Sequence, residues 1–198
     1  ELYVKKYPLK EFIEQVLIPD LHKMIDQQLH YYAFSVICQA IEVMGSIYDQ
    51  KNLEDCGASE TRFNNAIDNL FRDKRYREKR KIFYSFLRGP LIHQLRPGEG
   101  VYISSEKKDN ILRSNHLKND VKSGALILVI EQFFSDFINA YEIMKAVLAK
   151  RTDLDNRKIE QDFIAVMAIN PPHPMTAWDG GSNAPSTLTS YITGCAGI

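Results

Sequence analysis

Apolar side chains along the first part of the chain recur every three to four residues, which is the period of an amphipathic helix. One such run covers residues 9–25 and begins just after Pro8, a residue suited to the start of a helix. Similar runs cover residues 31–48 and 63–71. The pattern therefore predicts three helices. The first should kink or split at Pro19, because proline lacks a backbone N–H and clashes with the preceding turn.

The pattern changes after a fourth helical run at about residues 76–91. Residues 101–105 and 110–114 are short β-like runs on either side of a charged turn, and they predict a small hairpin. Residues 125–130 form an apolar run rich in branched side chains. This run fits either a third strand or the first turns of the next helix, and we favour the strand.

Two more helical runs follow the β-like region. The stronger one covers residues 132–150, and a last helix that starts at Asp153 or Asp155 would extend to Met167. Residues 171–198 are rich in Pro, Gly, Ser and Thr and lack a helical period, so they predict an irregular C-terminal tail.

These elements together predict one mainly α domain over residues 1–170. It is a bundle of five or six helices, with a small β-hairpin or short sheet inserted after the fourth helix, at about residues 100–130. A chain of 198 residues that is 44% hydrophobic can bury a substantial core. Its 25 Lys and Arg equal its 25 Asp and Glu, so any contact with a polyanion has to come from local clusters of charge.

The sequence predicts neither a membrane span nor a metal cofactor. No apolar run approaches the length needed to cross a bilayer. The three cysteines are far apart, and their spacing indicates neither a zinc site nor a disulfide framework, which favours a reducing cytoplasm. Four histidines show no metal-ligand spacing, and we interpret them as structural or surface residues: His22, His30, His116 and His173.

The string FYSFLRGPLIHQLRPG, at residues 83–98, places two chemically useful side chains at the end of an apolar helix. Four residues separate Arg88 from His93. The arginine is a fixed cation and the histidine is a base that works near neutral pH, and together they suffice in principle to cleave RNA without a metal. The pair resembles the signature of the HEPN superfamily (higher eukaryotes and prokaryotes nucleotide-binding), in which an arginine, four to six residues and a histidine lie near a helix end.

This resemblance implies an all-helical bundle, commonly a homodimer with its motifs facing each other, that acts in many members as a metal-independent endoribonuclease and needs no cofactor. It also implies a role in host defence or a toxin–antitoxin setting, with an antitoxin as the protein partner. Gly89, followed by Pro90, departs from the pattern, because the residue after the arginine is usually polar in active members. The alternatives are a non-catalytic HEPN-like dimeric scaffold or nucleotide-binding module, and a helical protein-interaction partner that uses the predicted hairpin of residues 101–114.

In the expected mechanism, His93 takes the proton from a ribose 2′-hydroxyl, which attacks the adjacent phosphorus and leaves a 2′,3′-cyclic phosphate. Arg88 would bind the phosphate oxygens and stabilise the charge of the transition state. On a regular helix, five residues turn two side chains ~140° apart. The pair therefore converges only if Pro90 lets the next turn swing away, or if a symmetric dimer supplies a second pair. Otherwise Arg88 caps helix-end carbonyls and His93 fills a polar niche.

Glu42 is a supporting candidate, because it is a carboxylate within an otherwise apolar helical run. A buried carboxylate needs a partner, and Glu42 would orient Arg88 or His93 from the facing helix. The alternative places Glu42 on the polar face of its helix beside Gln39.

A basic run, RDKRYREKRK at residues 72–81, lies directly before the motif. Its cations can hold phosphates and its tyrosine can stack on a base, which is a second reason to expect RNA as a partner. The alternative is a solvated charged turn, balanced by Asp73 and Glu78. The candidate RNA-binding residues are Arg72, Lys74, Arg75, Tyr76, Arg77, Lys79, Arg80 and Lys81.

Overall fold

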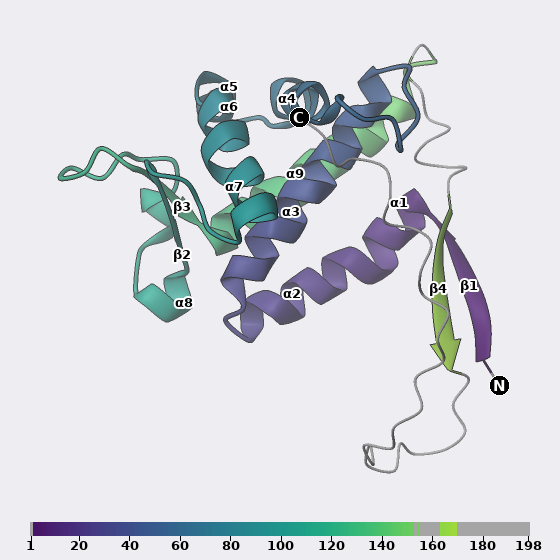
Figure 1. Ribbon diagram of the computed structural model, residues 1–198, viewed down its shortest axis with the longest axis horizontal. Coiled ribbons are helices and arrows are strands. Elements are labelled where there is room, and N and C mark those ends of the chain that lie inside the picture. Colours follow the sequence, from purple (N-terminus) through teal and green to yellow (C-terminus); the bar gives the residue numbers. More distant parts are fainter. Residues whose placement is uncertain (1, 153, 155–162, 170–198) are drawn as a thin grey trace. The chain divides into compact units, whose positions relative to one another are not determined.

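The computed structural model describes residues 2–152, 154 and 163–169 (Figure 1). Contacts divide the chain into two units, Glu1–Lys6 with Ala165–Ile198, and Tyr7–Ile164. The predicted irregular tail lies outside the described residues. We consider each unit by itself.

Two strands, β1 (Leu2–Pro8) and β4 (Phe163–Ile169), pair in a two-stranded sheet. The predicted last helix is therefore wrong for Phe163–Ile169. The sequence of this segment, FIAVMAI, contains three β-branched residues, which favour an extended strand once a partner strand is present.

The first helical segment of the larger unit runs without a break through α1 (Leu9–Phe12), a π-helical turn η1 (Ile13–Leu17) and α2 (Ile18–Asp26). Pro19 lies in the first turn of α2. The backbone N–H of Ile18 reaches back five residues to the Ile13 carbonyl, which is the hydrogen bond of a π turn. The wider turn accommodates the proline, so the predicted amphipathic helix is confirmed, whereas the split at Pro19 is wrong.

The centre of the bundle is α3 (His30–Gly45), which continues into a short 3-10 turn, η2 (Ser46–Tyr48). It contacts α2, α4 (Ser59–Leu70) and α9 (Ile130–Leu148). Gly45 lets α3 and α4 approach very closely. A Cβ at this position would overlap the carbonyl oxygen of Arg62 on α4 and lie 2.6 Å from the carbonyl carbon of the same residue.

The side chain of Arg62 stabilises the loop between η2 and α4. Its buried guanidinium pairs with the carboxylate of Asp49 at 2.6 Å. It also donates to the backbone carbonyls of Lys51, Asn52 and Leu53 at 2.6–3.2 Å. A buried arginine is tolerated here because its donors have partners.

The predicted fourth helix is a chain of shorter segments: α5 (Lys74–Glu78), α6 (Arg80–Ile82), the π-helical turn η3 (Phe83–Arg88) and α7 (Gly89–Gln94). The Gly89 N–H bonds to the Tyr84 carbonyl, again five residues back and again just before a proline. The chain stays helical through Gly89 and Pro90 and leaves the helix at Leu95, which has a left-handed backbone (φ 57°).

The insertion that follows contains β2 (Val101–Ser104), α8 (Glu106–Asp109), the 3-10 turn η4 (Arg113–Asn115) and β3 (Leu126–Val129). The strands β2 and β3 pair in parallel, with Val101 opposite Leu126. The strand predicted at 125–130 is confirmed, but the hairpin predicted from residues 101–105 and 110–114 is wrong. Figure 1 shows β2, β3 and α8 together at one end of the helices.

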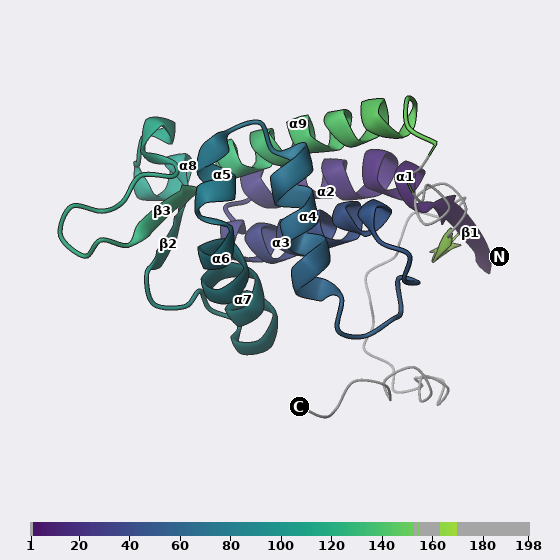
Figure 2. The same cartoon turned by 90° about the horizontal axis from the view of Figure 1, so that it is seen from above.

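The last helix of the larger unit, α9 (Ile130–Leu148), packs against α2, α3 and α4. Figure 2 shows α9 and α7 on opposite sides of α3. The aromatic core between them includes Phe34, Phe83 and Phe133, all fully buried. The predicted mainly helical bundle with a short sheet inserted after the fourth helical segment is thus confirmed.

Two further observations concern the length of the apolar helices and the state of the cysteines. In the part of the chain that the structure describes, no helix is both long and apolar enough to cross a membrane. Cys38 is a buried free thiol, whereas Cys56 is disulfide-bonded. The interpretation that the cysteines form no disulfide is therefore wrong for Cys56, and the argument for a reducing cytoplasm that rested on it is lost.

Candidate functional site

Arg88, at the end of η3, points toward α3 and pairs with Glu42. Its Nη2 donates to Glu42 Oε2 at 2.5 Å, and its guanidinium carbon lies 5.6 Å from the centre of the Tyr84 ring. The side chains of Arg88 and Glu42 are only 12% and 17% exposed. The expectation that Glu42 orients Arg88 from the facing helix is confirmed as a contact, and the alternative position of Glu42 on a polar face is not observed.

The π turn explains why this contact forms. A π turn contains more residues per turn than an α-helix, so η3 changes the direction in which the following side chains point. A Cβ at Gly89 would lie 3.3 Å from the Tyr84 carbonyl oxygen, so glycine eases this turn. The Arg88 Nε atom is buried and has no hydrogen-bond partner among the described residues. Arg88 is therefore a strongly held cation with donor capacity left over.

His93, on α7, is exposed to solvent and does not fill a polar niche. Arg88 and Gly89 both have right-handed helical backbones, with φ, ψ of −60°, −54° and −57°, −57°. The idea that Pro90 lets the next turn swing away is therefore wrong. Because the helix is continuous, the two side chains diverge by ~140° within one chain. Arg88 faces α3, and His93 faces solvent.

The pairing of Glu42 with Arg88 leads to a prediction about stability. Replacing Glu42 by leucine should lower the free energy of unfolding by about 2 kcal/mol, because it leaves a mostly buried guanidinium without its counter-charge. Adding Arg88→Met should restore most of that loss, since an apolar pair of similar volume needs no desolvated charge. Chemical denaturation of the two single variants, the double variant and the unaltered chain measures the coupling. Additive effects of the two substitutions would contradict it.

The basic run of residues 72–81 is divided between free and paired cations. Arg75 is held by Asp73, with Nη2 to Oδ2 at 2.6 Å, and Arg80 Nη1 lies 2.5 Å from Asp68 Oδ2. Lys79 donates to the side chain of Asn119, which lies outside the run. Arg77 is exposed. Three further cations of the run are exposed and have no ion pair among the described residues: Arg72, Lys74 and Lys81.

Tyr76 is completely buried, so the prediction that it stacks on a base is wrong. Its ring packs between Phe71 and Phe83, with ring centres 4.6 and 5.1 Å away. Its hydroxyl donates to Asp136 Oδ2 on α9 at 2.8 Å and meets His116 Nε2 at 2.8 Å. The tyrosine is a link between α5, α9 and the insertion, and no RNA base can reach it.

Sequence reasoning interpreted His116 as structural or surface and missed this network. The Val129 N–H donates to His116 Nδ1 at 3.0 Å, so the neutral ring carries its proton on Nε2 and donates to Tyr76. Burial, with the nearby Arg75 guanidinium, lowers the pKa of His116 to about 4. Burial also raises the pKa of Asp136. No spacing in the sequence indicated this set, because its members come from three separate segments.

A polar pocket of about 300 Å³ opens beside the network, lined by residues of α5, η4 and α9. Arg75 and Arg113 contribute positive charge to it, and Asp73 and Asp136 contribute negative charge. Arg75 is already bound to Asp73, and Arg113 to Glu106. The lining is therefore nearly balanced in charge and selects no anion or cation.

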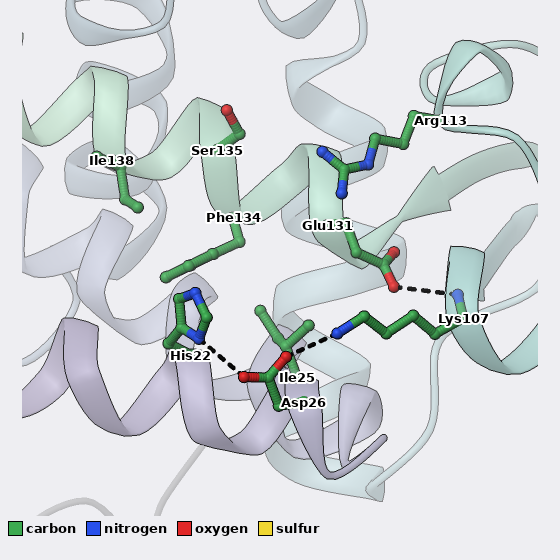
Figure 3. A pocket seen from close by; sticks show the side chains of 9 residues that line it. All are labelled: His22, Ile25, Asp26, Lys107, Arg113, Glu131, Phe134, Ser135 and Ile138. Atoms are coloured by element: carbon green, nitrogen blue, oxygen red, sulfur yellow. Dashed lines mark hydrogen bonds and ion pairs between the residues drawn. The ribbon is translucent and has the colours of Figure 1, made fainter.

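A second pocket, of about 310 Å³, lies between α2, α8 and α9 (Figure 3). His22 Nδ1 lies 3.1 Å from Asp26 Oδ2, and Lys107 Nζ donates to Asp26 Oδ1 at 2.7 Å. Ser135 also lines the pocket, so the residue types of a serine hydrolase are present. In Figure 3, however, the Ser135 hydroxyl points away from His22, with Phe134 between them. The geometry of a catalytic triad is not formed.

The described residues contain no group of three His, Cys, Asp or Glu side chains that could hold a metal ion. Arg88 and His93 lie on one helical segment, where Glu42 holds the arginine and the histidine is exposed to solvent. Comparison of the chain with protein-family models, with curated proteins and with solved structures finds no match.

Proposed function

We propose that this protein binds RNA and cleaves it without a metal at Arg88 and His93, leaving 2′,3′-cyclic phosphate ends. The observation that carries the proposal is the Glu42 to Arg88 ion pair, because it fixes an arginine on the same helical segment that carries the exposed His93. The resemblance of these two residues to the HEPN signature supplies the reaction class.

The residues act as follows in the proposed reaction. His93 accepts the proton of the ribose 2′-hydroxyl, and the oxygen attacks the neighbouring phosphorus. The bond to the 5′-oxygen breaks, and that oxygen takes a proton from water. Arg88 donates to the phosphate oxygens as negative charge gathers on them. Because Arg88 and His93 diverge within one chain, a homodimer that pairs the His93 of one copy with the Arg88 of the other completes the site.

The exposed cations of the basic run support RNA as the substrate. The run carries seven Lys and Arg and two acids, while the whole chain has no net charge. Phosphate contacts by such cations supply most of the affinity of proteins for nucleic acids. Host defence, or a toxin–antitoxin pair with a protein antitoxin, is the setting that the resemblance adds to the proposal.

A second candidate function is a non-catalytic HEPN-like scaffold or nucleotide-binding module. The low exposure of Arg88, at 12% of its side chain, favours this alternative, because an arginine that mainly joins η3 to α3 has a structural role. Gly89 in place of a polar residue favours it too. The further alternative, a protein-interaction partner that uses a hairpin of residues 101–114, loses its basis because that hairpin is absent from the described structure.

The proposal predicts that purified protein cleaves transfer RNA and single-stranded RNA in excess chelator. His93→Ala should lower the cleavage rate by roughly a hundredfold or more, the usual contribution of a general base. Because His93 is exposed, this variant should keep the stability of the unaltered chain. Analysis of the product ends for cyclic phosphate, with circular dichroism to check folding, makes the measurement.

His22→Gln is the matched control, since His22 is also an exposed helical histidine but lies on α2. It should cleave as fast as the unaltered chain. Equal rates for His93→Ala and the unaltered chain would exclude His93 as the base. Absence of cleavage by every form, with RNA binding retained, would favour the non-catalytic alternative.

A further inference from the structure

A tightly bonded hairpin leads into β3 and includes the first two residues of that strand, although the sequence did not predict a hairpin there. We call residues 117–127 the lysine hairpin, because both Lys118 and Lys122 are exposed on it. The Leu117 N–H donates to the Ile127 carbonyl at 2.8 Å, and the Ile127 N–H donates to the Lys118 carbonyl at 2.8 Å. An antiparallel bridge joins Asn119 to Leu126. In Figure 1 the chain before β3 extends away from the helices.

The tip of the lysine hairpin is held in one conformation. Asp120 Oδ2 accepts hydrogen bonds from the backbone N–H of Lys122 at 3.2 Å and from the N–H and hydroxyl of Ser123 at 2.8 and 2.7 Å. These bonds, the Ser123 hydroxyl first, lower the pKa of Asp120. The Asn119 amide donates to the carbonyl of Gly124, whose φ is +72°. The only acid of the hairpin is thus occupied within the turn, and the lysines are presented on an ordered backbone.

The base of the lysine hairpin is fixed to α5, the helix that carries much of the basic run. His116 is bound through its ring to Tyr76, and its carbonyl accepts from Arg75 Nη1 at 3.3 Å. Lys79 Nζ donates to the Asn119 side chain at 3.1 Å. Three bonds therefore place the hairpin directly beside the run, and the buried network around Tyr76 acts as their anchor.

The surface formed by the two elements is positive because its cations outnumber its acids: the run has seven Lys and Arg with two acids, and the hairpin has two Lys with one acid. Asp73 pairs with Arg75, and Asp68 pairs with Arg80. Among the described residues of the hairpin, Val121 is the one large apolar side chain that is exposed, at 99%. One such residue does not make the apolar centre that protein partners usually bury. Exposed cations on an ordered backbone suit the phosphates of a nucleic acid.

We propose that the lysine hairpin and the basic run of residues 72–81 form one continuous RNA-binding surface, in which Lys118 and Lys122 contact phosphates beyond those held by the run. This inference rests on the proposed RNA-binding function and specifies which surface the RNA follows. It assigns Tyr76 and His116 to positioning the surface, without contact to RNA.

The test replaces both hairpin lysines, as Lys118→Gln with Lys122→Gln, and measures the binding of a short fluorescein-labelled single-stranded RNA by anisotropy over a series of salt concentrations. The affinity should fall about tenfold at low salt, and the slope of log affinity against log salt should become shallower by about 1.4, since each lost contact to a single strand removes about 0.7. The control Lys51→Gln with Lys150→Gln removes the same charge from exposed positions far from the hairpin in sequence. It should leave the slope unchanged.

The outcomes separate the two proposals. If the unaltered chain binds no RNA, the proposed function fails. If binding is lost on neutralising Arg72, Lys74 and Lys81 but both lysine pairs behave alike, the basic run binds RNA and the inference about the hairpin is overturned. If the Lys118→Gln with Lys122→Gln variant binds RNA as the unaltered chain does but no longer binds an acidic protein, the surface serves a protein partner instead.

Discussion

Replacing Gly45 with alanine should strongly destabilise the protein. The added Cβ would overlap the Arg62 carbonyl oxygen and lie 3.1 Å from the Ala66 backbone nitrogen, and neither atom belongs to a side chain that can move aside. Overpacking usually costs 1–3 kcal/mol, and here two helix backbones have to separate, so we expect a loss of at least about 3 kcal/mol. That is a large part of the 5–15 kcal/mol that holds a typical domain together.

Urea denaturation followed by circular dichroism measures this loss, with Gly89→Ala as the matched control. Gly89 is also helical, but a Cβ there would meet its nearest atom at 3.3 Å, so a few tenths of an ångström of movement relieves it. Helix propensity favours alanine over glycine by about 1 kcal/mol, which should make the control neutral or slightly stabilising. Equal stabilities for the two variants would show that α3 and α4 can separate freely.

Acidification between pH 6.5 and 5 should destabilise the protein through His116. Burial lowers the folded pKa of this histidine to about 4, below the value of about 6.5 in an unfolded chain. In this window the unfolded chain binds the extra proton, so the contribution of His116 to stability is complete above pH 6.5 and is lost as the pH falls toward 4. The loss amounts to roughly 2 kcal/mol by pH 5 and roughly 3 kcal/mol by pH 4, at 1.36 kcal/mol per pH unit.

His116→Asn isolates this effect, because the asparagine carbonyl can still accept from the Val129 N–H. Its free energy of unfolding should depend less on pH, by roughly 2 kcal/mol between pH 6.5 and 5. The raised pKa of Asp136 acts in the opposite direction, since its contribution is present at low pH and is lost as the pH rises through its folded pKa. Parallel pH profiles for the variant and the unaltered chain would mean that His116 titrates as it does in an unfolded chain.

The long helices could be predicted from the sequence because each buries a continuous apolar stripe, as α3 and α9 do. The partner of a short strand could not. The alternation at Val101–Ser104 indicated a strand, but its parallel partner Leu126–Val129 comes only after α8, η4 and the turn of the lysine hairpin. Nor could the sequence show that Phe163–Ile169 pairs with Leu2–Pro8, since pairing across almost the whole chain depends on tertiary contacts.

Part of the candidate site could be predicted from the sequence, namely the contact of Glu42 with Arg88, whereas the burial of Tyr76 could not. A carboxylate in an apolar run needs a partner, and that reasoning found Glu42 beside Arg88. Tyr76 was misjudged because its neighbours in sequence are charged, whereas its neighbours in space are Phe71, Phe83 and Asp136. In the five-residue helix α5, the residues around Tyr76 are charged, so composition alone does not indicate that the tyrosine faces inward.

The π turn before Pro90 works as a phase shift in the helix that carries the motif. An extra residue per turn rotates everything that follows about the helix axis, without changing the relative angle between later residues. The π turn of Phe83–Arg88 therefore sets the direction of Arg88 toward α3. The angle between Arg88 and His93 is set by the ordinary helical geometry of α7. The length of this one turn thus decides which face of the segment, and with it which of the two side chains, is buried against the bundle.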